Sequence, residues 1–191
     1  MLWSVGLAFS AVLNGIYGGG SMACRLLVAS LGGFWAMRLA GHLWLRVRTE
    51  PESGRYRALR ERWGGSQLKW FGLFQFQALL IPLFSISCAA AAANASPKIA
   101  WLAVALGIWN ASVLGETHAD HQLAQFRADP ANRGRICRAG LWRYARHPNY
   151  FFDWLHWFCY VALAIGGPTV WYAVSGPVLR LIVLRWISRV R

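Results

Sequence analysis

The residues best suited to chemistry gather in one segment of the 191-residue chain, residues 116–157. Glu116, Asp120 and Arg127 share one face of this stretch if it is helical, because they are four and seven positions apart. The sequence Arg143-Tyr-Ala-Arg-His-Pro-Asn149 follows them. The segment therefore offers carboxylate, guanidinium and amide groups to a ligand.

Pro148 marks the expected start of a second helix. It moves His147 out of the α region and suits the first helical turn. The free N–H groups and the positive dipole end of that helix would then lie beside Arg143 and Arg146. Because a planar guanidinium matches phosphate oxygens, this pattern predicts an anion site.

Asp153 lies in the first turns of the same helix, and His156, Trp157 and Tyr160 continue its face. A carboxylate inside a membrane span is costly, which makes Asp153 a candidate functional residue. The alternative is that it pairs with a nearby Arg or His. Two roles remain equally possible for Tyr144: a contact with the ligand, or membership of an aromatic belt at the membrane interface.

The other arginines of this segment have a simpler interpretation. Arginines at the cytoplasmic edge of a membrane commonly set topology and contact lipid headgroups. We favour that role for Arg133, Arg135 and Arg138. The proline-started helix favours ligand binding for Arg143 and Arg146.

A metal site is not predicted. Four residues of metal-ligand type crowd together, but they point to different helical faces, so at most three can converge. No HExxH motif or second cluster supports them. The four residues are Glu116, His118, Asp120 and His121.

Polar residues also interrupt two apolar segments. Gln75 and Gln77 lie within FGLFQFQALL, where a buried amide either bridges helices, which we favour, or lines a substrate cavity. Arg38 and His42, one helical turn apart, pose the same choice.

The elements that must position these residues are membrane helices. The chain is 57% hydrophobic and only 14% charged, against about 25% charged in soluble domains. This composition excludes disorder, and four scattered cysteines exclude a disulfide scaffold. A span needs about 20 apolar residues. Six segments approach this length: residues 2–19, 26–45, 71–93, 99–115, 150–165 and 169–187.

The distribution of charge supports this count. The net charge of +13 is concentrated in the second and fourth links, residues 46–69 and 127–146, and in the C-terminal tail. The other three links are nearly neutral. The positive-inside rule then places both termini and both Arg-rich loops in the cytoplasm. We expect one all-α integral membrane domain over residues 1–191 that binds no nucleic acid, because its basic residues flank spans.

The sequences GLWRYARHPNYFFDWLHW, ADHQLAQFRADPANRGRIC and RYRALRERWG with FQFQALL resemble the bacterial DUF1295 branch of the steroid 5-alpha-reductase family. The resemblance implies a helical enzyme of the bacterial inner membrane. Such an enzyme uses NADPH to reduce a conjugated carbon–carbon double bond beside a carbonyl of a steroid- or isoprenoid-like substrate. It places cofactor binding at Glu116, Asp120, Arg127, Tyr144, Arg146, His147, Asn149 and Asp153.

The chain also departs from the family pattern. The Tyr that assists the reaction in steroid-reducing relatives falls near Trp35, which we accordingly place in the substrate cavity. The family's catalytic acid has no counterpart, since no acid precedes Glu50, and the catalytic donor is not assigned. We expect a chain shortened at both ends.

Two alternatives to the reductase remain. Isoprenylcysteine carboxyl methyltransferases are similar in the same C-terminal region and use S-adenosylmethionine. The second alternative is a non-catalytic paralogue, in which the Arg-rich loops only bind anionic lipid.

Overall fold

The computed structural model describes residues 2–49 and 54–189, and the regular elements in these ranges are all helical. Glu50 and Arg191, which enter the sequence analysis, lie outside the described residues. The helices are α1 (Leu2–Tyr17), α2 (Met22–Thr49), α3 (Gly54–Trp63), α4 (Gln67–Ala92), α5 (Ile99–Ala128), α6 (Pro148–His156), α7 (Phe158–Ala164), α8 (Val170–Ala173) and α9 (Ser175–Arg189). Two short 3₁₀ helices, η1 (Pro130–Asn132) and η2 (Gly140–Arg143), lie between α5 and α6.

Three helices are long and apolar enough to cross a membrane. They are α2 over Met22–Leu45, α4 and α5, with stretches of 24, 26 and 30 residues. α1 is apolar but shorter. The last two predicted spans are each divided, the fifth at Trp157 and the sixth at Val174. Three of the six predicted spans are thus single helices long and apolar enough to cross a membrane, and a fourth, α1, is a continuous but shorter helix.

The break in the sixth predicted span has a local cause. Gly176 and Pro177 fall in the first turn of α9, where proline is tolerated because its missing N–H has no helical partner. The sequence therefore starts a new helix at Ser175.

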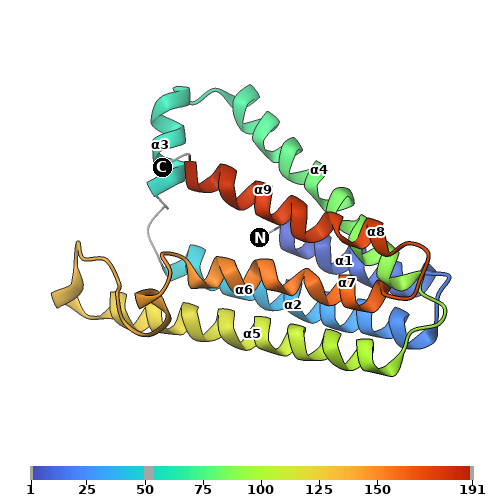
Figure 1. Ribbon diagram of the computed structural model, residues 1–191. Coiled ribbons are helices and arrows are strands. Elements are labelled where there is room, and N and C mark those ends of the chain that lie inside the picture. Colours follow the sequence, from blue (N-terminus) through green and yellow to red (C-terminus); the bar gives the residue numbers. More distant parts are fainter. Residues whose placement is uncertain (1, 50–53, 190–191) are drawn as a thin grey trace.

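The near-neutral links meet at one end of the bundle. Gly20 N donates to Ala92 O at 3.0 Å, and the side-chain amide of Asn94 donates to Leu163 O at 2.8 Å and Ile165 O at 3.1 Å. Asn94 is fully buried, so its amide fastens the links that precede α5 and follow α7. The Arg-rich segments lie at the opposite end (Figure 1). This arrangement matches the alternation of charge predicted from the sequence.

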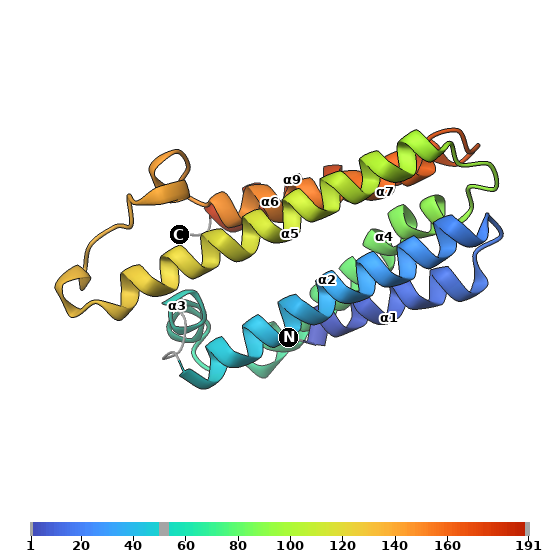
Figure 2. The same cartoon turned by 90° about the horizontal axis from the view of Figure 1, so that it is seen from below.

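The bundle has two groups of helices. α1 packs against α2 and α4, while α5 packs against α6 and α7. Figure 2 shows these groups as two layers, with α9 in the same layer as α5 and with the ribbons farther apart at the Arg-rich end. Large buried aromatic side chains join the layers. The ring centroid of Trp157 lies 4.4 Å from Phe84 and 5.9 Å from Trp35.

α3 lies in the second link, which the sequence analysis treated only as an Arg-rich loop. The rings of Trp63 and Tyr56 pack against Trp70 of α4, with centroids 5.0 and 6.1 Å apart. Gly64 and Gly65 have φ angles of +56° and +78°, a region that favours glycine, and they turn the chain from α3 to α4.

Candidate functional site

α5 and α6 bring the predicted acidic and amide side chains together. The amide nitrogen Nδ2 of Asn149 donates to Oδ1 of Asp120 at 3.1 Å. Glu116 lies one turn before Asp120 on α5, and Asp153 lies one turn after Asn149 on α6. Residues from two parts of the segment 116–157 therefore form one cluster.

The helices can approach closely because Gly115 has no side chain. A Cβ at Gly115 would lie 2.3 Å from the ring of Phe152. The hydroxyl of Ser112 also donates to Phe152 O at 2.8 Å. These contacts fix α6 on α5 at the level of Glu116.

α2 supplies basic partners for both carboxylates of α5. Arg38 lies 2.5 Å from Oε2 of Glu116, which also accepts from Nε1 of Trp35 at 3.3 Å. One turn farther, Nε2 of His42 lies 3.8 Å from Asp120. Arg38 and His42 therefore bridge helices, one of the two roles that the sequence left open for them.

Asp153 is paired with Arg180 of α9. Their side chains are 6% and 11% exposed, so the ion pair is buried. The pairing is the alternative that the sequence left open for Asp153. Sequence reasoning missed Arg180, although an arginine in the middle of the apolar segment 169–187 was a signal that could have identified it.

His156 continues the polar face of α6 into the core. Its Nε2 lies 3.1 Å from the hydroxyl of Tyr160, and its ring stacks on Trp35 with centroids 4.3 Å apart. Both rings are essentially inaccessible to solvent. Trp35, predicted to face a substrate cavity, thus packs between His156 and Glu116.

Several polar atoms of this region are buried and lack a hydrogen-bond partner among the described residues. An unsatisfied buried polar group costs roughly 1–3 kcal/mol, and such groups are rare in native proteins. The unpartnered atoms of this region can therefore still form hydrogen bonds with a polar ligand. These atoms include Nε1 of Trp3 and Trp157, Oγ of Ser4, Nε of Arg38 and Arg180, Oδ1 of Asp153 and Nδ1 of His156.

The segment that leads into α6 is held against α5. Gly140 has a φ of +55°, a region that favours glycine. The backbone N–H of Leu141 donates to Oε1 of Gln122 at 2.9 Å, and the indole of Trp142 donates to Ala119 O at 2.9 Å. These contacts place the following arginines beside the start of α6.

The remaining predicted ligand residues surround this end of α5 and α6. Arg127, Arg146 and Tyr144 are exposed, Tyr144 to 85%. His147 precedes α6 and stacks on Tyr150 with centroids 4.9 Å apart. The exposed groups lie on the segments that lead to the buried cluster.

Gln75 and Gln77 are exposed and half-buried, respectively. Neither lines the pocket that other residues of α4 form with α9, so their role in a substrate cavity stays a prediction. Near the site, His118 and His121 contact Gln122 and Gln125 at 2.9 and 3.0 Å.

The described helices include three that are long and apolar enough to cross a membrane, which is consistent with an integral membrane protein, and they enclose a buried charged cluster. The chain matches the family described as protein of unknown function (DUF1295) over residues 1–191, and it belongs to that family. Searches of curated proteins and of solved structures gave no match.

Proposed function

We propose that this protein is an NADPH-dependent membrane reductase that reduces a conjugated carbon–carbon double bond beside a carbonyl of a lipophilic substrate. The observation that carries the proposal is the meeting of Asp120 and Asn149 across α5 and α6. Both residues match cofactor positions of the resembling reductases. Membership of the DUF1295 family supports the same assignment.

The proposed topology has six spans. α6 with α7 forms the fifth and α8 with α9 the sixth, in addition to α1, α2, α4 and α5. Both Arg-rich segments and both termini face the cytoplasm of a bacterial cell, because the Arg-rich segments share one end of the bundle (Figure 1). The site at the start of α6 then opens toward soluble NADPH.

The groups at this end suit the phosphates of NADPH. Arg143 and Arg146 are exposed and form no ion pair within residues 2–49 and 54–189. They precede Pro148, so they lie near the free N–H groups of the first turn of α6. Arginine binds phosphate oxygens in a bidentate manner, and two unpaired guanidinium groups beside a helix start therefore fit such a ligand.

The buried groups suit the uncharged parts of the cofactor and a carbonyl. Asp120 and Asn149 would hold hydroxyl or amide groups, and Asp153 has a buried oxygen, Oδ1, without a hydrogen-bond partner. Nε of Arg38 and Nε1 of Trp157 are buried donors without a partner. The residues present therefore fit NADPH and a carbonyl substrate.

When bound, NADPH would supply a hydride to the β-carbon of the substrate. The protein's own residues would bind and orient the two molecules and exclude water. A buried donor would stabilise the negative charge that develops on the carbonyl oxygen, an interaction that strengthens in a low-dielectric site. The ion pairs of Arg38 with Glu116 and Arg180 with Asp153 would hold these donors in place.

The test is equilibrium binding of NADPH and S-adenosylmethionine, measured side by side on the detergent-purified chain. We expect NADPH to bind and to protect residues 127–146 from trypsin, which cleaves after the arginines of this segment. Binding of S-adenosylmethionine alone would identify a methyltransferase. Binding of neither would indicate a non-catalytic membrane protein.

A further inference from the structure

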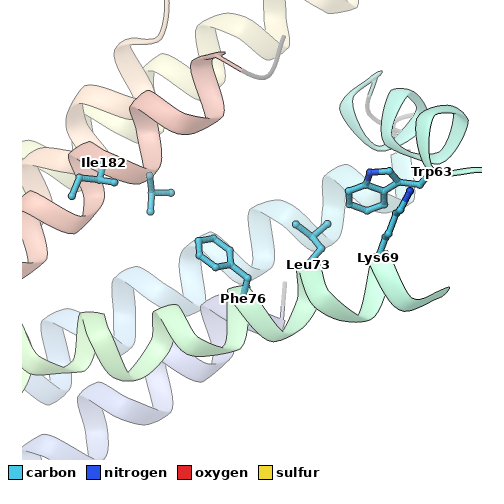
Figure 3. Close-up of a pocket in the computed structure, with 6 residues that line it drawn as sticks. Trp63, Lys69, Leu73, Phe76 and Ile182 are labelled. Atoms are coloured by element: carbon cyan, nitrogen blue, oxygen red, sulfur yellow. The ribbon is translucent and has the colours of Figure 1, made fainter. Parts of the chain in front are cut away.

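An apolar pocket lies between α4 and α9 beside α3. It has a volume of about 600 Å³ and is lined by Trp63, Lys69, Leu73, Phe76, Ile182 and Val183. Figure 3 shows Leu73 and Phe76 on α4 facing Ile182 on α9, with Trp63 and Lys69 together at one end. Lys69 is the charged member of this lining.

The α4 wall of the pocket changes from charged to apolar along the helix. Lys69, Leu73 and Phe76 are spaced four and three residues apart, so they share one face, which Leu80 continues into the core. Lys69 is exposed, whereas Leu80 is 8% exposed. The distance along the axis from Lys69 to Phe76 is about 10 Å. This wall matches a molecule with an anionic end and an apolar body.

The α9 wall connects the pocket to the buried polar cluster. Val183 lies one turn after Arg180, on the same face of α9, and packs against the hydrophobic core. Arg180 pairs with Asp153 of α6. A ligand in the pocket would therefore lie about one helical turn from a pair that belongs to the candidate site.

We propose that this pocket binds the apolar body of the substrate and that the substrate is an amphiphile with an anionic group, which Lys69 contacts. The assignment rests on the proposed reductase function. Burial of the apolar body supplies affinity through contact with Leu73, Phe76 and Val183. The lysine selects anionic amphiphiles over neutral ones, because an ammonium group near the membrane surface attracts a carboxylate or phosphate.

The experiment compares binding of radiolabelled oleate and oleyl alcohol to the detergent-purified full chain. We expect oleate to bind more tightly than the alcohol. Lys69→Gln should weaken oleate binding about fivefold and leave the alcohol unchanged, and Lys69→Arg should restore oleate binding. Leu73→Trp should reduce binding of both ligands at least tenfold because it fills the pocket.

Two matched variants serve as controls. Lys98→Gln removes an exposed lysine at the opposite end of the bundle, and Leu79→Trp adds an indole at an exposed position of α4 outside the pocket. Both should bind oleate like the parent. Equal binding of oleate to the parent, Lys69→Gln and Leu73→Trp would overturn the proposal. Displacement of oleate by an equal concentration of phosphatidylcholine, which has no net charge, would also overturn it and assign the pocket to bulk lipid.

Binding of NADPH to the same preparations separates the two proposals. If oleate follows the expected pattern but NADPH does not bind, the pocket assignment stands and its role as a substrate site is wrong. If NADPH binds and oleate does not follow the pattern, the substrate class alone is wrong.

Discussion

Removal of Arg180 tests the importance of the buried ion pair with Asp153. Arg180→Leu would leave the Asp153 carboxylate without its cation at a position where both side chains are nearly inaccessible, 6% and 11% exposed. Breaking a buried pair by removing one partner costs about 3–5 kcal/mol. For a chain of this size that loss corresponds to a fall in unfolding temperature of about 10 °C.

The double variant Asp153→Leu with Arg180→Leu shows whether the loss of stability comes from the unpaired charge or from altered packing of the side chains. Replacement of both members of a buried pair by apolar residues is often close to neutral, so this variant should recover most of the lost unfolding temperature. Arg143→Leu, at an exposed site where the described part of the chain offers no ion pair, should change stability little.

Thermal unfolding in detergent can be followed with a thiol-reactive fluorescent dye. Cys24, Cys88, Cys137 and Cys159 are free and buried, so they react when the fold opens. The reasoning would be refuted if Arg180→Leu unfolded at the temperature of the parent, or if the double variant were less stable than both single variants.

Three further predictions concern packing, hydrogen bonding and charge. Gly115→Ala should lower the free energy of unfolding by about 1–3 kcal/mol, because the added Cβ would clash with Phe152. The control is Gly107→Ala on the same helix, which has open space around it and should be neutral or stabilising. Asn94→Ala should cost about 1–3 kcal/mol because two backbone carbonyls lose their donor, and equal stability would contradict the role assigned to its amide. Arg146→Ala should weaken NADPH binding, and the affinity of the variant should depend less on salt concentration than that of the parent. If the variant and the parent gave the same NADPH titrations in low and in high salt, a contact between Arg146 and phosphate would be excluded.

Local chemistry made α5 and α6 predictable from the sequence. The helix that continues past the fourth apolar segment ends at Ala128, directly before Asp129-Pro130, because this pair of residues favours a turn. α6 begins at Pro148, which the sequence predicted as a helix start. The contact of Asp120 with Asn149 then follows because both lie on the facing sides of adjacent helices.

Contacts between distant segments were not predictable in the same way. Arg38 and Glu116 are 78 positions apart, and no periodic pattern specifies which helices α2 contacts. Arg180 is flanked by apolar residues, so nothing in its neighbours indicates its pairing with Asp153. The division of the fifth span falls at Trp157, whose indole packs against Phe84 and Trp35, residues of distant segments.

The most direct test of the account is NADPH binding by energy transfer from tryptophan in the parent chain, Asn149→Ala and Asn110→Ala. The chain has 12 tryptophans, so bound NADPH should quench their emission. Asn110 is exposed on α5, and its side-chain amide donates to Leu106 O of its own helix, which makes it a matched control. We predict saturable binding to the parent and Asn110→Ala, and binding weakened about tenfold in Asn149→Ala through loss of a hydrogen bond beside a carboxylate. Equal NADPH binding by all three proteins, or binding by none of them, would contradict the assignment of the cofactor site to α5 and α6.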